Sequence, residues 1–150
     1  MNTSSSAPIA DSVRPASIGR SSWFGVSEIT GRVLLGSLFL VAGLYKIGTY
    51  AGTVGYMTSF GVPGALLPIV IATEVVGALA IILGWKTRIA SFLLAGYSLL
   101  TAVIFHHQFG NQIEMNMFLK DLSVAGGFLL LVANGAGPIG FDCRLSKRDR

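Results

Sequence analysis

Four long apolar stretches, separated by shorter and more polar connections, dominate the chain. Each stretch is apolar throughout and lacks the alternation of apolar and polar positions that is typical of a β-barrel strand. A helix of about 20 apolar residues crosses the hydrocarbon core of a bilayer, which is roughly 30 Å thick. The pattern therefore predicts an all-α integral membrane protein, a bundle of four transmembrane helices. The expected spans are residues 29–47, 65–85, 89–105 and 117–134.

The three connections between these spans differ in length and polarity. Residues 84–88 form a tight turn, and such a short link predicts that the second and third spans pack as an antiparallel hairpin. The connection 48–64 is longer and carries apolar residues at helical spacing, which predicts a short helix lying on the membrane interface. The last connection, 106–116, collects polar side chains and reads HHQFGNQIEMN.

Charge is scarce and unevenly distributed. Hydrophobic residues make up 52% of the chain and charged residues 12%, whereas soluble proteins average about 25% charged. So few charges cannot cover the surface of a water-soluble fold. The composition excludes an ordinary cytosolic enzyme, a disordered chain and a nucleic-acid-binding protein, and it makes the lipid bilayer the main expected partner. Within residues 33–119 the charged side chains are Lys46, Glu74, Lys86, Arg88 and Glu114.

The basic residues gather on one side of the expected membrane. By the positive-inside rule this side is cytoplasmic, so both termini are expected in the cytoplasm; only Lys46 and Lys120 lie near the other side. We expect residues 1–27 to form a disordered cytoplasmic tail, residues 28–142 the membrane domain, and residues 143–150 a basic cytoplasmic tail. The residues that set this orientation are Arg14, Arg20, Arg32, Lys86, Arg88, Arg144, Lys147, Arg148 and Arg150.

Small residues mark the faces through which the helices are expected to meet. In the first span, Gly36 and Gly43 share one helical face with Phe39. Such a stripe lets two backbones approach closely in lipid, where water provides no drive to bury apolar side chains. Lys46 and Arg32 lie at the two ends of this face, and we interpret Arg32 as a cytoplasmic anchor. A similar face is predicted for the last span, with Lys120, Ser123, Gly127, Leu130 and Asn134.

Glu74 is the candidate functional residue expected deepest in the membrane. An ionisable group at that depth costs roughly 3 kcal/mol or more unless it faces the bundle, finds a partner or is protonated. Lys46 falls on the glycine face of the first span and is the expected partner, although a lysine near a helix end can also snorkel to the interface. Two interpretations stay open: the pair handles a ligand or a proton, or it is a structural tie between helices.

His106, His107 and Glu114 are the candidates at the expected outer mouth. Adjacent residues on a helix point about 100° apart, so the two histidines cannot readily bind one metal ion, and no metal site is expected. Either histidine could hydrogen-bond a quinone or pass a proton at neutral pH; the alternative is a helix cap in a solvated loop. The sequence shows no motif for a catalytic nucleophile, a phosphate loop or a dinucleotide. The single cysteine, Cys143, excludes an internal disulfide.

Several short motifs spread along residues 28–142 carry a resemblance to a known family. The motifs are Gly31-Arg32-Val33-Leu34-Leu35-Gly36, Leu38-Phe39-Leu40 with Ala42-Gly43 and Lys46, Gly61-Val62-Pro63, Glu74 with Gly77, Gly84-x-x-Thr87-Arg88, and Gly137-Pro138 with Asp142. In order and spacing they resemble the DoxX family of bacterial membrane proteins, which includes DoxD-like members. The resemblance implies a four-helix protein of the cell inner membrane with both ends inside. It also implies a link to redox and sulfur chemistry, since DoxD-type relatives are subunits of a thiosulfate:quinone oxidoreductase.

These observations lead to one main functional hypothesis and two alternatives. The main hypothesis is a small, non-autonomous membrane subunit of a quinone- or sulfur-linked redox system, in which quinone is the candidate ligand and a redox enzyme the partner. The first alternative is a transporter or exporter of a small solute, with Glu74 as the proton-coupling group; it would require a homo-oligomer, because four helices leave little room for alternating access. The second is a non-catalytic assembly or stress protein.

Overall fold

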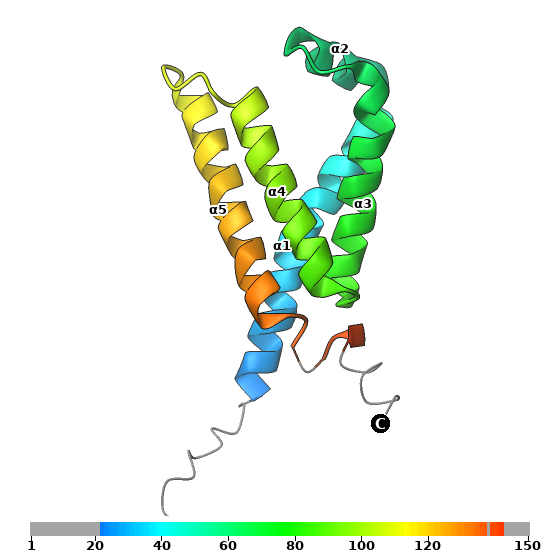
Figure 1. The fold of residues 1–150 in the computed structure, drawn as a ribbon, viewed down its shortest axis with the longest axis vertical. Coiled ribbons are helices and arrows are strands. Elements are labelled where there is room, and N and C mark those ends of the chain that lie inside the picture. Colours follow the sequence, from blue (N-terminus) through cyan, green and yellow to red (C-terminus); the bar gives the residue numbers. More distant parts are fainter. Residues whose placement is uncertain (1–21, 138, 143–150) are drawn as a thin grey trace, which may run out of the picture.

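The computed structural model describes residues 22–137 and 139–142, which form helices joined by short connections (Figure 1). This part of the chain contains no strand. It contains four helices that are long and apolar enough to cross a membrane, which confirms the predicted all-α architecture with four spans. The elements are α1 (Ser22–Gly48), α2 (Tyr50–Ser59), the short 3-10 helix η1 (Gly64–Leu66), α3 (Leu67–Leu83), α4 (Thr87–Phe105) and α5 (Gln112–Asn134).

The helix boundaries agree with the predicted spans except at two N-termini. Helix α1 begins at Ser22 and α5 at Gln112, both earlier than expected. The early start of α5 has a local cause, because the Asn111 side chain accepts a hydrogen bond of 2.9 Å from the Ile113 N–H and so caps the helix. The short helix expected between the first two spans is present as α2. Residues 1–21 and 143–150, including Cys143 and six of the nine orienting basic residues, lie outside the described residues, and the cytoplasmic orientation stays a prediction.

The four long helices pack as two pairs, α1 with α3 and α4 with α5. Figure 1 shows that the pairs converge where α3 turns into α4, which we call the termini end because α1 begins and residue 142 lies there. Toward the opposite end, which α2 covers and which we call the α2 end, the pairs diverge. The tight turn therefore joins the second and third spans as expected, but each of these helices makes its main contact with a different neighbour.

The predicted glycine face of α1 is the face that packs against α3. A Cβ atom at Gly36 would lie 2.5 Å from Ile82 Cγ1, and one at Gly43 would lie 2.7 Å from Val75 Cγ2. Both distances are too short for real atoms, so glycine is what allows the two backbones to approach. Phe39, on the same face, is buried against Ala78 and Phe128 in the core.

The predicted packing face of the last span is wrong. Helix α5 instead buries Ala125 and Phe128, whereas Lys120, Ser123, Leu130 and Asn134 are exposed; Gly127 is partly buried and lies close to Leu35 of α1. The reason is that the polar side chains of the expected face do not need a neighbouring helix. Ser123 Oγ donates to Leu119 O at 2.8 Å and Asn134 Nδ2 donates to Leu130 O at 2.9 Å, so both are satisfied by their own helix.

At the termini end, residues 135–137 and 139–142 lie against the α3–α4 turn. Both carboxylate oxygens of Asp142 accept backbone hydrogen bonds at the start of α4, from Lys86 N at 2.7 Å and from Thr87 N at 2.9 Å. Gly84 ends α3 in the left-handed region with φ of 73°, and a side chain there would collide with Arg32 Nη1. Arg32 is only 2% exposed, so it is packed into this end and is not a freely solvated anchor.

Candidate functional site

Three polar side chains from three different helices meet inside the bundle. Glu74 on α3 is only 3% exposed, and its two carboxylate oxygens each accept a hydrogen bond of 2.8 Å from Lys46 Nζ on α1. Tyr97 on α4 donates its hydroxyl hydrogen to Glu74 Oε1 at 2.6 Å. We call Lys46, Glu74 and Tyr97 the buried triad. The expected pairing of Lys46 with Glu74 is therefore present, and it satisfies the condition under which a carboxylate is tolerated at this depth.

Tyr97 is the member of the triad that the sequence analysis missed. Its ring counts as apolar in a hydropathy pattern, so the hydroxyl in the middle of a span did not stand out. A signal was nevertheless available, because a buried tyrosine hydroxyl needs a hydrogen-bond partner and Glu74 was the expected ionisable group at a similar depth. The ring packs edge-on against Phe39 at a centroid distance of 6.1 Å, which fixes the direction of the hydroxyl.

A second polar cluster lies nearer the α2 end, between the end of α4 and the first turns of α5. His106 Nδ1 lies 2.8 Å from Glu114 Oε2, and His106 Nε2 lies 4.0 Å from Asp121 Oδ2. Lys120 Nζ lies 3.1 Å from Asp121 Oδ1. We call these four residues the mouth network, because their side chains are all partly exposed. Two of them, His106 and Glu114, were predicted candidates that the structure brings together.

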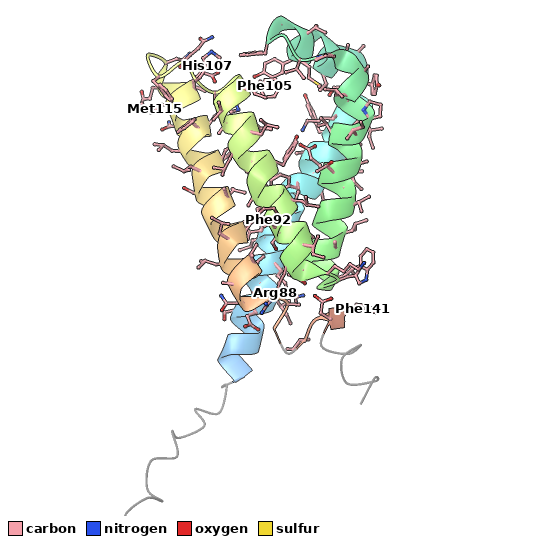
Figure 2. The ribbon with its side chains drawn as sticks, viewed as in Figure 1. Arg88, Phe92, Phe105, His107, Met115 and Phe141 are labelled. Atoms are coloured by element: carbon pink, nitrogen blue, oxygen red, sulfur yellow. The ribbon has the colours of Figure 1, made fainter. Side chains whose placement is uncertain are left out.

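Asp121 joins this network from the body of α5 and not from its N-terminal end. Because α5 begins at Gln112, Asp121 lies in the third turn, beyond the reach of the terminal N–H groups. It faces His106 across the end of α4 instead. His107 was also a predicted candidate, but it belongs to neither the mouth network nor the pocket lining. It is exposed, its Nδ1 lies 3.1 Å from Ile104 O, and it stands at the outer edge of the α4–α5 connection (Figure 2).

A pocket of about 380 Å³ lies between the buried triad and the mouth network. All three triad residues and three residues of the mouth network, His106, Lys120 and Asp121, line it; Glu114 and His107 do not. Most of the remaining wall is apolar, so the pocket is a largely hydrophobic chamber with polar groups at two places. That combination is typical of sites for small, mainly apolar molecules that need a few directed hydrogen bonds. Representative apolar lining residues are Leu38, Met57, Val70, Leu100 and Ile104.

Helix α2 forms the cover of this pocket. Tyr56 and Met57 of α2 line it, and Met57 is buried. The Tyr56 ring stacks on Phe105 at 5.4 Å between centroids, and Phe60 packs edge-on against Phe105 at 5.3 Å. In Figure 2 Phe105 lies at the end of α4 that faces α2. Burial, together with the negative charge of Glu114, raises the pKa of Tyr56, so its hydroxyl is neutral at physiological pH.

The described part of the chain contains no group of three or more His, Cys, Asp or Glu side chains arranged to hold a metal ion. The arrangement can instead donate and accept hydrogen bonds. Lys46 carries three N–H donors, and Glu74 takes two of them, which leaves one for another acceptor. On the opposite wall, Lys120 and His106 provide further donors, and the mouth network connects the pocket to partly exposed carboxylates.

Comparison with known proteins shows that the segment containing these residues matches a family model. The chain matches the family model DoxX over residues 28–107, a segment that contains the whole buried triad and His106. Inner membrane protein YqjF of Escherichia coli (strain K12) is 45% identical over 123 residues, which cover 82% of this chain and 95% of that protein. Inner membrane protein YphA of the same organism is 40% identical over 123 residues, covering 77% and 88%.

A more distant relative carries a name that refers to chemistry. The protein named "Putative oxidoreductase CatD" of Bacillus subtilis (strain 168) is 32% identical over 81 residues, which cover 54% of this chain and 60% of that protein. No solved structure matches the chain significantly.

Proposed function

The chain belongs to the DoxX family and is a multi-pass inner membrane protein, and on this premise we propose that it is the membrane subunit of a redox system that binds a quinone in the pocket. The observation that carries the proposal is the combination of an apolar chamber of about 380 Å³ with hydrogen-bond donors on two facing walls. A quinone has flat apolar faces and two carbonyl oxygens on opposite edges of its ring, so it needs such a site.

The charges that line the pocket favour a neutral ligand. Lys46 is paired with Glu74 and Lys120 with Asp121, so the lining cations are each compensated by a carboxylate. An anion such as thiosulfate would have to displace one of these carboxylates from its partner, whereas a neutral quinone would only use the donors that remain. The proposal therefore assigns the quinone, and not a sulfur oxyanion, to this chain.

Each polar group has a separate part in the proposed mechanism. The free N–H of Lys46 donates to one quinone carbonyl, and Glu74 holds Lys46 and Tyr97 in position. The other carbonyl faces His106 and Lys120. Reduction of a quinone consumes two electrons and two protons; the electrons come from a partner redox enzyme, and the two polar clusters supply protons to the carbonyl oxygens. Support for a redox role also comes from the name of the Bacillus subtilis relative.

Binding of a quinone analogue to the purified protein tests the proposal. Wild-type protein should bind the analogue, and excess thiosulfate should not compete. Glu74→Gln keeps the shape of the side chain but removes the charge that holds Lys46, and we expect at least a tenfold loss of affinity, since hydrogen bonds to charged groups contribute about 1.5–3 kcal/mol. Tyr97→Phe should cause a smaller loss.

The two histidines provide a matched control, because they are adjacent in the sequence and only one of them lines the pocket. His106→Gln should weaken binding of the analogue, whereas His107→Gln should leave the affinity unchanged. If Glu74→Gln protein is folded and binds the analogue with full affinity, the buried triad is a structural tie between helices and the proposed quinone site is wrong.

A further inference from the structure

A second cavity, separate from the pocket, runs along the outer surface of the bundle between α3 and α4. Its volume is about 410 Å³, and it shares no residue with the pocket. We call it the α3–α4 groove. Its lining includes several small residues and the buried Leu94. The small residues on its two sides are Ala72, Gly77, Ala80 and Ala90.

The groove is apolar along its length and basic at one end. Its rims carry Val76, Ile89 and Leu93, which are 59%, 61% and 60% exposed. At the termini end it is closed by Trp85 and Lys86. These two residues lie between the spans that end at Leu83 and begin at Thr87, so we expect them at the level of the lipid headgroups. Tryptophan and lysine are the residues that typically occupy this level.

The length of the groove fits one leaflet of a bilayer. The part of α3 from Ala72 to its end at Leu83 is about 17 Å long at a rise of 1.5 Å per residue. Half of the hydrocarbon core of a bilayer is about 15 Å thick. An acyl chain that begins at the level of Trp85 would therefore end near Ala72, where the groove ends.

The backbone holds Lys86 in an uncommon conformation at the end of the groove. Lys86 has φ of 44° and is the only described residue other than glycine with a positive φ. The left-handed region is unfavourable for a lysine, and here the backbone is fixed by the hydrogen bonds that Asp142 accepts from Lys86 N and Thr87 N. Because Asp142 occupies the N-terminus of α4, an anion at this end of the groove would meet the Lys86 side chain, which is the basic residue of the groove lining. No described carboxylate forms an ion pair with it, and its Nζ lies 5.5 Å from the Trp85 ring centroid.

We propose that the α3–α4 groove is a binding site for an anionic phospholipid, with one acyl chain in the groove and the phosphate at Lys86. The apolar walls match the acyl chain, and the Lys86 ammonium, which forms no ion pair with a described carboxylate, matches the charge of the phosphate. The site does not depend on the proposed quinone function, because the two cavities are lined by different residues.

Native mass spectrometry of the full-length protein in mild detergent tests the proposal, with phosphatidylglycerol and phosphatidylcholine as competing probes. The wild type should retain one phosphatidylglycerol in preference to phosphatidylcholine. Lys86→Gln should reduce this preference about fivefold, since a basic residue near the membrane surface contributes about 1 kcal/mol. Lys86→Arg should preserve it. Arg88→Gln is the matched control, because Arg88 lies at the same end but outside the groove, where its Nη2 donates to Ala133 O at 3.3 Å.

A second variant fills the groove without touching the headgroup site. Val76→Trp adds bulk at the rim and should remove the retained lipid of either headgroup, while Leu79→Trp, on an exposed part of α3 outside the groove, should not. Equal losses of preference in Lys86→Gln and Arg88→Gln would overturn the proposal, because they would reflect general surface charge. It would also be overturned if Val76→Trp retained the lipid, or if it converted a dimer into a monomer, which would make the groove a contact between two copies.

Discussion

The two ends of the bundle contain similar charged residues but use them differently. At the termini end, Arg32 is buried next to Gly84, and the Asp142 carboxylate accepts hydrogen bonds from two backbone N–H groups at the start of α4. Between the middle of the bundle and the α2 end, Lys46 and Glu74 form an ion pair, and this pair borders a pocket of about 380 Å³. The difference shows that a charged residue inside this bundle is not by itself a sign of function. The space beside it distinguishes a candidate site from a structural contact.

Two glycines with similar backbone conformations show that the termini end is packed more tightly than the α2 end. Gly84 and Gly61 have nearly the same left-handed backbone, with φ of 73° and 75°. A Cβ atom at Gly84 would collide with Arg32 Nη1 and lie 2.8 Å from Gly140 Cα, whereas one at Gly61 would meet nothing within 4 Å. The termini end is thus closed by packing, and the α2 end leaves room around its turn.

The largest effect is expected from removing the carboxylate of the buried triad. Glu74→Leu leaves Lys46 and the Tyr97 hydroxyl without their partner, and we expect it to lower the free energy of unfolding by about 3 kcal/mol. Replacing both charges, as Lys46→Met with Glu74→Leu, should restore most of this stability, because a buried ion pair and a well-packed apolar pair are often similar in energy. Denaturant unfolding in detergent micelles measures both variants.

The same double variant separates stability from function. It should remain folded and lose binding of the quinone analogue, because the donor at Lys46 is gone. A folded double variant that still binds the analogue would mean that the α2 end, like the termini end, uses its charges for packing alone.

A smaller effect is expected from the pair of left-handed glycines. Gly84→Ala should lower the free energy of unfolding by about 2.5 kcal/mol, since backbone strain and overpacking each cost about 1–3 kcal/mol and the Arg32 side chain can shift to relieve part of the collision. Gly61→Ala carries only the strain and should cost about 1 kcal/mol. Thermal unfolding of the two variants under identical conditions gives the difference, and equal losses would show that the termini end is not closed more tightly than the α2 end.

The third effect compares the helix caps at the two ends. Asp142 caps α4 with two charge-assisted hydrogen bonds, whereas Asn111 caps α5 with one. We expect Asp142→Ala to lower the free energy of unfolding by about 2 kcal/mol and Asn111→Ala by about 0.5 kcal/mol, the upper and lower parts of the range for N-caps. Hydrogen exchange at the first turns of α4 and α5 would show where each loss arises; a larger opening at α5 would contradict the comparison.

The sequence predicted the spans well because lipid imposes a strong pattern. Long apolar runs are required wherever a backbone crosses the membrane, and a buried charge such as Glu74 requires a partner. The glycine face of α1 then correctly indicated that Lys46 was that partner. The glycine-face prediction depends only on spacing along one helix. The span and partner predictions depend on the strict requirements that lipid places on backbone polar groups and on buried charges.

The remaining features depend on tertiary structure or on the exact start of a helix. The start of α5 was predicted too late because Asn111 caps the helix well before its apolar run begins. The face of α5 was wrong because Ser123 and Asn134 bond to their own helix. The contribution of Tyr97 and the cover formed by α2 arise only when separate helices meet, and no spacing within one segment encodes them.

The smallest effect concerns the α2 cover and its dependence on pH. Burial, reinforced by the negative charge of Glu114, raises the pKa of Tyr56 above its ordinary value of 10. A pKa that is higher in the folded state means that the stabilisation is complete below pH 10 and is lost as the pH rises through the folded value. The packing of Tyr56 on Phe105 should therefore weaken only in strongly alkaline solution. Ultraviolet titration of tyrosinate in the wild type, compared with Tyr56→Phe, isolates this group. Glu114→Gln should move the titration of Tyr56 to lower pH but leave its pKa above the ordinary value, because burial is the larger cause. If the pKa of Tyr56 returned fully to the ordinary value, the charge of Glu114 would be the whole cause, and α2 would not bury the Tyr56 hydroxyl.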